Sequence, residues 1–225
     1  MELILGIDDA GRGPVIGPMV LAGVLIDKKY EAELKKLGVT DSKQLTPKRR
    51  EFLVDKVKER AETFEIIRIK PIEIDNTLDE DGSRIKLNEI EAHACAEIIN
   101  RINKGFTKIK VVVDCPSISL DKWRAYLLTK IDNLSNLEIS CEHKADKNHL
   151  AVSAASILAK STREKEMNKL KEIYGEEIGS GYTSDPLTQK FIQKNAEKFK
   201  NDGIFRQTWE TWKKAYSDLA QRRLF

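Results

Sequence analysis

The chain has 225 residues, of which 40% are hydrophobic and 33% are charged. This balance fits one ordinary domain with a buried core and argues against an intrinsically disordered chain. The formal net charge is only +3, so any affinity for nucleic acid must come from local clusters of charge. The N-terminus lacks the basic region of a signal peptide, and no stretch reaches the roughly 18 apolar residues of a membrane-spanning helix. We therefore expect a soluble, cytoplasmic protein without contact to membranes.

The three cysteines, Cys95, Cys115 and Cys141, are odd in number and widely separated, and they form no C-x-x-C pair. This pattern predicts reduced thiols in an intracellular protein and argues against a disulfide framework. We expect the three side chains to act as small buried hydrophobic groups.

Strand patterns and helix patterns follow one another along the chain. Strands are predicted at residues 3–8, 19–26, 64–71, 109–114 and 137–141. Helices are predicted at residues 46–60, 85–102, 150–174, 186–199 and 207–220. The helix at residues 46–60 has Thr46 as its N-cap and Pro47 at its first position, and a Gly-rich break at residues 179–182 follows the helix at residues 150–174.

This order of elements predicts an α/β fold: a mixed five-stranded sheet flanked by helices, with a helical C-terminal cap. We divide the chain into a larger domain at residues 1–175 and a helical C-terminal region at residues 176–225. The sequence contains no internal repeat, no low-complexity tract and no long linker.

Four acidic residues stand at the ends of predicted strands. Asp8 and Asp9 end the first strand, Asp114 ends the fourth, and Asp146 follows the fifth, before a helix. In open α/β sheets the functional crevice lies outside the carboxyl ends of the strands. If the first and fourth strands are parallel neighbours, Asp8 and Asp114 converge there. Taken singly, each acid could equally be a turn former or a helix cap.

Clustered carboxylates raise each other's pKa unless a cation neutralises them. Mg²⁺ prefers carboxylate and water oxygens, and two such ions roughly 3.5–4 Å apart activate water and stabilise the leaving oxygen of a phosphodiester. The four acids together therefore favour a metal site, although their spacing alone does not name the reaction.

Residues 6–14 read Gly-Ile-Asp-Asp-Ala-Gly-Arg-Gly-Pro and resemble the opening motif of ribonuclease HII (type 2 ribonuclease H), G-[IV]-D-E-A-G-R-G-P. Further matching blocks follow in the order of that family: residues 41–45 (DSKQL), 113–114 (VD), 142–146 (EHKAD), 152–160 (VSAASILAK) with Arg163, and 179–185 (GSGYTSD). Six ordered blocks make a specific resemblance. The HKAD form of the fourth block is typical of archaeal members.

The resemblance implies a ribonuclease H-like catalytic domain over residues 1–175. It also implies an endonuclease that cuts the RNA strand of RNA/DNA hybrids and incises 5′ of single ribonucleotides in duplex DNA. Two ions, Mg²⁺ or Mn²⁺, would activate water and leave 5′-phosphate and 3′-hydroxyl ends. The implied role is the removal of ribonucleotides during DNA replication and repair.

Individual roles follow by position in the motifs. The four metal-binding acids correspond to Asp8, Asp9, Asp114 and Asp146, which are also the catalytic residues. Gly11, Arg12 and Gly13 match the loop whose backbone grips the ribose 2′-hydroxyl, the group that distinguishes RNA from DNA. Tyr182 matches the tyrosine that stacks on the sugar after the ribonucleotide. Phosphate contact or support of the active site is implied for Ser42, Lys43, Lys144 and Arg163.

One position departs from the family pattern, which has Glu where this chain has Asp9. The shorter side chain withdraws the carboxylate by roughly 1.5 Å. This casts doubt on the strength of metal binding at Asp9 but not on the resemblance.

Two rival functions remain open at this point. The first is a metal-independent ribonuclease that uses His93, His143 or His149 and leaves cyclic phosphates. The second is a catalytically silent module that binds hybrids, with Asp9 as the lesion. A type 3 enzyme is disfavoured, because those enzymes carry an extra N-terminal domain and this chain begins at the first strand.

The C-terminal residues 221–225, Gln-Arg-Arg-Leu-Phe, weakly resemble peptides that bind sliding clamps. Only one aromatic residue of that pattern is present, so a solvated helix end is the favoured interpretation. We expect a monomer, because no separate apolar seam is evident.

Overall fold

The computed structural model describes residues 1–39, 45–78 and 82–222. Contacts between residues divide the chain into two compact units. The first unit comprises Met1–Ala10, Val20–Ile67 and Ile85–Ser161, and the second comprises Gly11–Met19, Arg68–Arg84 and Thr162–Phe225. The predicted boundary between residues 175 and 176 stays a prediction.

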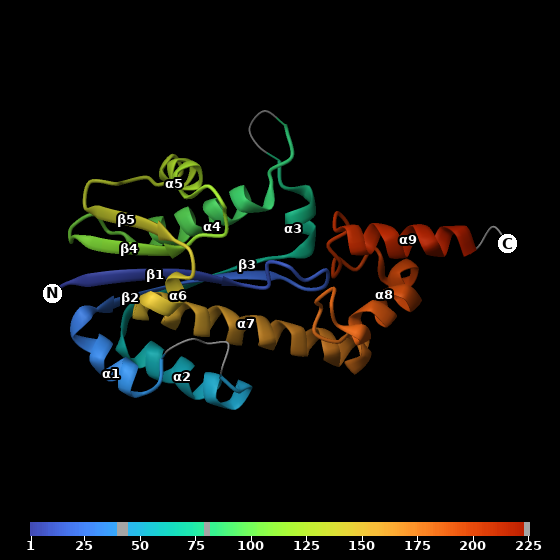
Figure 1. The fold of residues 1–225 in the computed structure, drawn as a ribbon, viewed down its shortest axis with the longest axis horizontal. Coiled ribbons are helices and arrows are strands. Elements are labelled where there is room, and N and C mark those ends of the chain that lie inside the picture. Colours follow the sequence, from blue (N-terminus) through green and yellow to red (C-terminus); the bar gives the residue numbers. More distant parts are fainter. Residues whose placement is uncertain (40–44, 79–81, 223–225) are drawn as a thin grey trace. The chain divides into compact units, whose positions relative to one another are not determined.

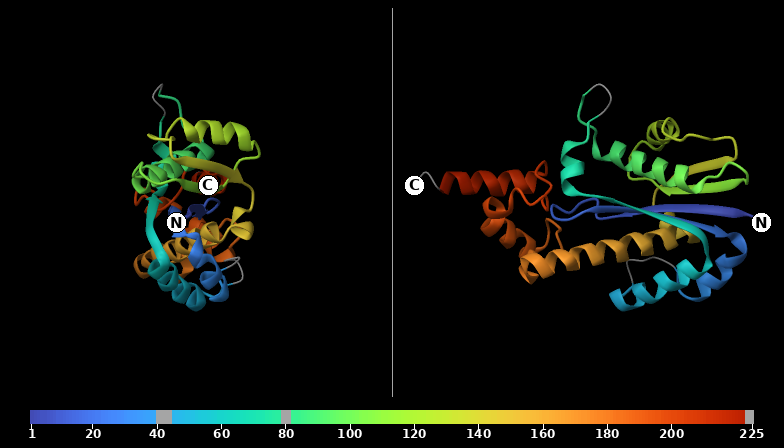
Figure 2. Two further views of the ribbon diagram at one scale, coloured as in Figure 1. Left: turned by 90° about the vertical axis from the view of Figure 1, so that its left-hand side faces the viewer. Right: turned by 180° about the vertical axis from the view of Figure 1, so that it is seen from behind.

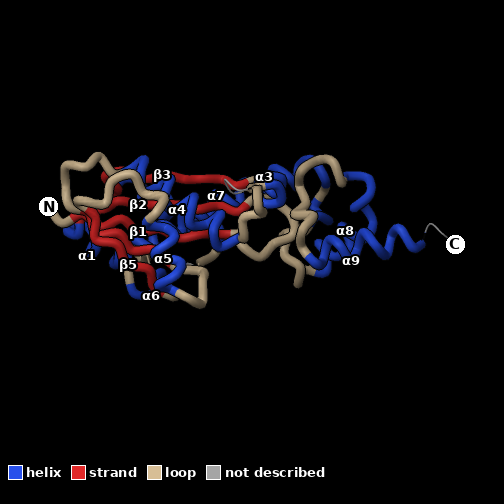
Figure 3. Tube along the Cα trace, turned by 90° about the horizontal axis from the view of Figure 1, so that it is seen from above, coloured by secondary structure: helices blue, strands red, loops and turns tan. Residues whose placement is uncertain are grey.

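A five-stranded mixed sheet forms the centre of the first unit and confirms the predicted fold class. Its strands are β1 (Leu3–Ala10), β2 (Met19–Asp27), β3 (Ala61–Ile69), β4 (Ile109–Asp114) and β5 (Leu137–Glu142). They lie in the order β3-β2-β1-β4-β5, as Figure 3 shows for the labelled strands. The central strand β1 is antiparallel to β2 and parallel to β4, and β4 is parallel to β5.

Helices cover both faces of this sheet (Figure 1). One face carries α1 (Glu31–Lys36), α2 (Pro47–Arg60), the short α6 (Ala145–Asn148) and the first part of α7 (Leu150–Tyr174), and the other carries α4 (Leu87–Ile102) and α5 (Leu120–Leu128). Buried residues of β1, β2, α1, α2 and α7 form one apolar cluster. Helix α2 begins as predicted, because Thr46 Oγ1 accepts a hydrogen bond from the amide of Arg49 and Pro47 needs no partner for its nitrogen.

The contact between α7 and the sheet depends on Gly6. A Cβ atom at this position would lie 2.1 Å from the main-chain carbon of Ala151. Because glycine has no side chain, the first turn of α7 lies directly on β1. This close approach brings the following turn of α7, with Ser153 and Ser156, toward the acidic residues of the sheet.

The second unit is mainly helical. It contains α3 (Pro71–Asn76), the rest of α7, a short 3₁₀ turn (Glu176–Ile178), α8 (Pro186–Phe199) and α9 (Glu210–Arg222). Helices α8 and α9, orange and red in Figure 2, pack against each other. Its core is rich in aromatic groups, with Phe205 and Trp212 in contact at a ring-centroid distance of 4.4 Å.

Several elements differ from the sequence prediction in their bounds, among them α4, which begins at Leu87 rather than at residue 85. Strand β1 continues two residues beyond Asp8, to Ala10, because its antiparallel pairing with β2 continues to the pair Ala10–Val20. Helix α9 begins three residues later than predicted, because residues 206–209 form a turn whose amides at Gln207 and Thr208 bind Asp75. Strand β3 starts at Ala61, directly after α2.

The short helices α1, α3, α5 and α6 were not predicted. Across the described residues, no helix combines the length and the apolar character required to cross a lipid bilayer.

Candidate active site

Asp8 and Asp9 lie on the part of β1 that extends past its parallel neighbour. The last β1–β4 pair is Ile7 with Val113, and Asp114 is the final residue of β4. The sequence placed both acids at the end of the first strand, whereas they lie within it and only their pairing with β4 has ended. The expected parallel neighbourhood of the first and fourth strands is confirmed, and it brings Asp8 and Asp114 to the same edge.

Asp8 is almost completely buried, with 6% of its surface exposed. Burial raises the pKa of its carboxyl group well above the ordinary value, and the charges of Asp9 and Asp114 raise it further. Hydrogen bonds from the Ser156 hydroxyl and from the amide of Asp9, at 2.8 Å, offset part of this pKa shift. An ionised Asp8 is therefore unfavourable here unless a positive charge joins it.

Asp114 and Asp146 are linked through the short helix α6. Asp114 Oδ1 accepts a hydrogen bond of 2.9 Å from the amide of Ala145, the first residue of α6. Asp146 lies within α6, which the sequence did not predict, and it precedes α7 as expected; 4% of its surface is exposed. Its backbone oxygen accepts a bond of 2.5 Å from Ser153 Oγ, whereas its buried Oδ1 has no hydrogen-bond partner among the described residues.

An unpaired buried oxygen of this kind costs about 1–3 kcal/mol or more if it is charged. The unpartnered oxygen of Asp146 and the raised pKa of Asp8 are both consistent with a site for a divalent cation that prefers oxygen ligands. In the described parts of the chain, however, no three His, Cys, Asp or Glu side chains are grouped closely enough to hold a metal ion by themselves.

Lys144 precedes α6 and is exposed. Its φ of 57° is the only positive value at a non-glycine residue in the part of the chain that the structure describes. A lysine in the left-handed region costs about 1–2 kcal/mol. The backbone strain at Lys144 therefore accompanies the turn that brings α6 under Asp114. Ser42 and Lys43 lie outside the described residues.

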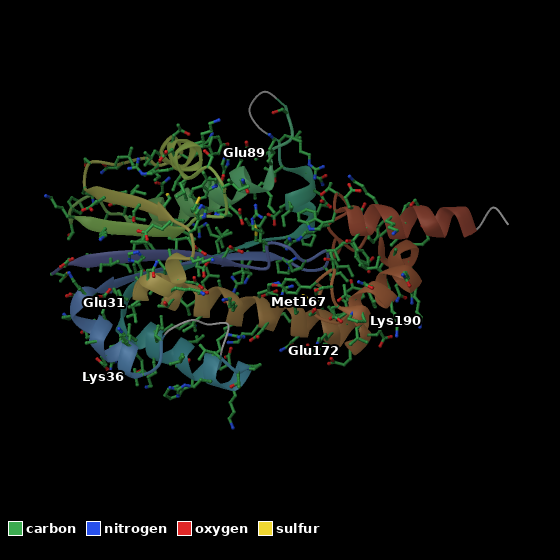
Figure 4. The ribbon with its side chains drawn as sticks, viewed as in Figure 1. Glu31, Lys36, Glu89, Met167, Glu172 and Lys190 are labelled. Carbon is green, nitrogen blue, oxygen red and sulfur yellow. The ribbon has the colours of Figure 1, made fainter. Side chains whose placement is uncertain are left out.

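The Gly11–Gly17 loop of the second unit depends on glycine at two positions and is open at a third. Gly11 and Gly17 have φ values of 83° and 86°, which side chains other than glycine rarely adopt. At Gly17 an added Cβ would lie 2.6 Å from the sulfur of Met167, labelled in Figure 4. Gly13, by contrast, is exposed, and a Cβ there would meet nothing within 4 Å. The loop is thus packed on one side and open at Gly13.

Arg163 and Tyr182 form a stacked pair within the second unit. The guanidinium carbon of Arg163 lies 4.9 Å from the centre of the Tyr182 ring, and its Nη2 donates to the carbonyl of Ser180 at 3.0 Å. Arg163 is 8% exposed, and a Cβ on Gly11 would come within 2.3 Å of its side chain. Tyr182 is 42% exposed. Arg163 thus lies beneath the tyrosine and against the loop, which favours support over direct phosphate contact.

The family model described as "Ribonuclease HII" matches residues 5–212 of this chain.

The chain belongs to the ribonuclease HII family.

Two similar curated relatives are archaeal proteins, as the HKAD block predicted. A ribonuclease HII of Methanococcus maripaludis is 42% identical over 226 residues, covering 100% of this chain and 91% of the relative. One from Thermococcus sibiricus is 40% identical and covers 97% of this chain and 93% of the relative. As a ribonuclease HII, the chain is a ribonuclease H enzyme and therefore a hydrolase of RNA paired with DNA.

Solved structures agree with this family. The ribonuclease H2 of Pyrococcus horikoshii has a TM-score of 0.84 at 36% identity, covering 96% of this chain and 98% of that chain. A ribonuclease HII from Archaeoglobus fulgidus, solved in complex with PCNA, has a TM-score of 0.78 at 36% identity and covers 92% and 94%. A ribonuclease HIII with Mn²⁺ shares the fold, with a TM-score of 0.76 at 21% identity, covering 99% and 71%.

The three histidines of the chain have hydrogen-bond partners within the protein. His93 Nε2 lies 2.8 Å from the Tyr126 hydroxyl, and the two rings stack. His143 Nδ1 lies 3.2 Å from the carbonyl oxygen of Cys115, and His149 Nε2 lies 2.8 Å from a carboxylate oxygen of Glu142. These contacts argue against the rival in which histidines carry the catalysis.

The cysteines are free thiols. Burial raises the pKa of Cys95 well above its ordinary value and raises that of Cys141 to about 12. Cys115 is buried as well. Cys95 and Cys115 therefore fit the predicted role of small buried hydrophobic groups, whereas Cys141 is only partly buried.

Four residues that contact predicted site residues were not singled out from the sequence: Ser153 and Ser156 in the first unit, and Arg206 and Trp209 in the second. The two serines are three residues apart on α7, so they share one helix face, and this spacing was a usable signal. Arg206 gave no signal, because it is one of 39 basic residues and nothing near it marks it as buried.

A cavity of about 720 Å³ in the first unit is not lined by any of the four acids. Its wall includes Lys28, Lys35, Lys110, Lys147 and His149. Lys28 is already paired with Glu2, which also lines the cavity.

Proposed function

We propose that this enzyme cuts the RNA strand of RNA/DNA hybrids and incises on the 5′ side of single ribonucleotides in duplex DNA, leaving 5′-phosphate and 3′-hydroxyl ends. The observation that supports metal-dependent cleavage is the buried Oδ1 of Asp146, which has no hydrogen-bond partner among the described residues. It lies in the same unit as Asp8, whose carboxyl group has a raised pKa. The cellular role we propose is the removal of ribonucleotides during DNA replication and repair, in the cytoplasm.

Asp8, Asp9, Asp114 and Asp146 are proposed to hold divalent cations. Mg²⁺ or Mn²⁺ bound there supplies an activated water and stabilisation of the leaving oxygen. Neighbouring residues of the chain orient these carboxylates. Ser156 donates to Asp8, and Ser153 holds the main chain of Asp146, so both acids stay oriented before a cation arrives.

Gly11, Arg12 and Gly13 are proposed to recognise the ribose. Open space at Gly13 lets a sugar approach the backbone, and amide groups can then bind the 2′-hydroxyl. The exposed ring of Tyr182, backed by Arg163, provides a stacking surface for the next sugar. Lys144, with Ser42 and Lys43, is proposed to contact phosphates, which position the duplex without reading its sequence.

The test uses one labelled DNA duplex with a single embedded ribonucleotide, an all-DNA duplex of the same sequence and an RNA/DNA hybrid. We expect incision 5′ of the ribonucleotide in Mg²⁺ or Mn²⁺, none in excess EDTA and none on the all-DNA duplex. End mapping distinguishes the rivals, because histidine catalysis without metal leaves cyclic phosphates. Cleavage that persists in EDTA overturns the metal mechanism, and binding without cleavage in either ion supports the silent module.

A sliding clamp is a proposed partner, and a monomer is the proposed oligomeric state. The relative from Archaeoglobus fulgidus was solved in complex with PCNA. In this chain the segment that would bind such a clamp is residues 221–225.

A further inference from the structure

Arg206 is a fully buried arginine, with 0% of its surface exposed. Its guanidinium group donates hydrogen bonds to the carbonyl oxygens of Gly11 at 2.5 Å, Arg12 at 2.6 Å and Gly17 at 3.1 and 3.3 Å. A buried guanidinium is tolerated only when its donors are satisfied. Here the donors of Arg206 are satisfied by main-chain oxygens of one loop, which lies 189–195 residues away in the sequence.

Because Arg206 binds carbonyl oxygens of the loop, peptide geometry also determines which way the amide groups of the loop point. The described peptide bonds are all trans, and in a planar trans peptide the C=O of one residue and the N–H of the next point in opposite directions. Because Arg206 binds the carbonyls of Gly11 and Arg12, the amides of Arg12 and Gly13 are turned away from its guanidinium. These are the amides that a ribose hydroxyl would need.

The turn that carries Arg206 is itself fixed. Asp75 of α3 accepts bonds from the amides of Gln207 at 2.6 Å and Thr208 at 3.3 Å. The Arg206 amide donates to the Val15 carbonyl at 2.8 Å, and the Trp209 indole donates to the Gly13 carbonyl at 3.2 Å. The guanidinium carbon also lies 5.1 Å from the Trp209 ring centre. Residues 206–209 thus bind the carbonyls of five residues of the Gly11–Gly17 loop.

We propose that Arg206 is a positioning residue for ribonucleotide specificity: it holds the Gly11–Gly17 loop with its amides facing the substrate side. This rests on the proposed role of that loop in ribose recognition. Lysine cannot replace the arginine, because its ammonium is a point charge on a flexible stem, whereas the guanidinium fork reaches several carbonyls at fixed angles.

The main experiment compares Arg206→Lys with Arg50→Lys. Arg50 is a matched control, because it is also buried, with 8% of its surface exposed, and it also donates to a main-chain carbonyl, that of Leu45. Unlike Arg206, it belongs to the first unit. Affinity is measured in EDTA for a duplex with one ribonucleotide and for the all-DNA duplex. In Arg206→Lys we expect the preference for the ribonucleotide to fall by about tenfold, the equivalent of one lost hydrogen bond to a polar group, with unchanged affinity for DNA.

A second measurement reports on the loop without any substrate. The chain has 12 glycines, so ¹⁵N-glycine labelling gives a sparse amide spectrum. Arg206→Lys is expected to shift or broaden the signals of Gly11, Gly13 and Gly17, and Arg50→Lys is expected to leave them in place. If Arg206→Lys does not fold, Trp209→Phe removes only the indole donor to Gly13 and is expected to give a smaller change of the same kind.

The outcomes separate the two proposals. A folded Arg206→Lys with unchanged glycine signals and an unchanged preference overturns the role of Arg206, as does an equal loss in Arg50→Lys. A wild-type protein that shows no preference and no ribonucleotide-dependent incision contradicts the proposed function. In that case the glycine spectra still decide whether Arg206 holds the loop.

Discussion

The surroundings of Asp8 oppose the ionisation of its carboxyl group. Burial, then the charges of Asp9 and Asp114, raise its pKa above the ordinary value of an aspartate. Below that ordinary value, near 3.9, the group is protonated in the folded and the unfolded chain, and its contribution to stability is fully present. As the pH rises through the raised folded pKa, this contribution is lost. At neutral pH without metal, Asp8 therefore lowers the stability of the fold.

Asp8→Asn should consequently be more stable than the wild type in EDTA at pH 7 and nearly inactive. One unit of pKa shift corresponds to about 1.4 kcal/mol, and each kcal/mol to roughly 2–4 °C in Tm for a chain of this size. Calorimetry between pH 4 and 8 measures the gain, which should shrink toward pH 4. Mg²⁺ should stabilise the wild type more than the variant.

Asp185 provides a control of opposite sign. Hydrogen bonds from the Ser180 hydroxyl and amide lower its pKa, so its contribution is present above the ordinary pKa of aspartate and lost as the pH falls through the folded value. Asp185→Asn should therefore destabilise the protein at pH 7 and lose this effect in acid. A gain in stability from Asp8→Asn that does not depend on pH would contradict the account of Asp8.

Asp9→Glu is expected to raise the rate in Mg²⁺, and by less in Mn²⁺. Displacing a reactive group by about 1 Å costs on the order of 100-fold in rate, and glutamate restores the reach of the family motif. Mg²⁺ demands near-ideal octahedral geometry, so it is more sensitive to the retracted ligand. Titration of both ions on one embedded-ribonucleotide duplex measures this. A slower Asp9→Glu at saturating Mg²⁺ would show that the site is adapted to aspartate.

Gly13→Ala separates the needs of the fold from the needs of a ligand. Its backbone lies outside the left-handed region and its Cβ would meet nothing within 4 Å, so stability should stay level or rise by about 0.4–1 kcal/mol. Incision at a ribonucleotide should nevertheless fall by about tenfold or more if the sugar approaches this backbone. Gly11→Ala is the contrast, because its Cβ would lie 2.3 Å from Arg163 and should destabilise the protein. Unchanged incision by Gly13→Ala would remove Gly13 from the ribose contact.

Long elements of this fold are visible in the sequence because their apolar residues repeat. Helix α8 has the predicted bounds, and β4 has them as well. Short elements are not visible: α6 has four residues and α3 has six, too few to establish a period. Such helices exist because distant groups complete them, as Asp114 does for the first amide of α6. The four acids could thus be named from the sequence, but not the bond from Ser156 to Asp8 in the first unit or the bonds from Arg206 to the Gly11–Gly17 loop in the second.

The turn before α6 allows a test at the level of that element. Lys144→Gly removes a strain of about 1–2 kcal/mol and adds about 0.5–1 kcal/mol of unfolded-chain entropy. We expect the free energy of unfolding to rise by up to about 1 kcal/mol. Lys147→Gly, inside α6, should instead lower it by about 1 kcal/mol. Denaturant unfolding of both variants decides this, and a destabilised Lys144→Gly would mean that the lysine side chain holds the turn.

At the scale of the whole molecule, the near balance of charge means that partners are reached through segments and patches rather than through a global field. The double variant Leu224→Ala/Phe225→Ala should weaken binding to an archaeal sliding clamp by about tenfold, because buried aromatic and aliphatic anchors dominate such interfaces. Incision of free duplex should be unchanged. Lys213→Ala serves as the control, since its ion pair with Glu210 is exposed and contributes little. Equal clamp affinity of both variants and the wild type would contradict the proposed segment.

The raised pKa values of Cys95 and Cys141 have a practical consequence for fluorescence work. With a pKa of about 12, Cys141 has only about one thiolate in 10⁵ molecules at pH 7, and the thiolate is the form that reacts with maleimides. Cys95 is shielded in the same way. A cysteine introduced at the exposed position of Asn168 on α7 would have an ordinary pKa of about 8.5 and would react far faster. Dyes can therefore be attached at chosen sites without removing the native cysteines, so that single molecules can be followed on their substrate with an otherwise unaltered chain.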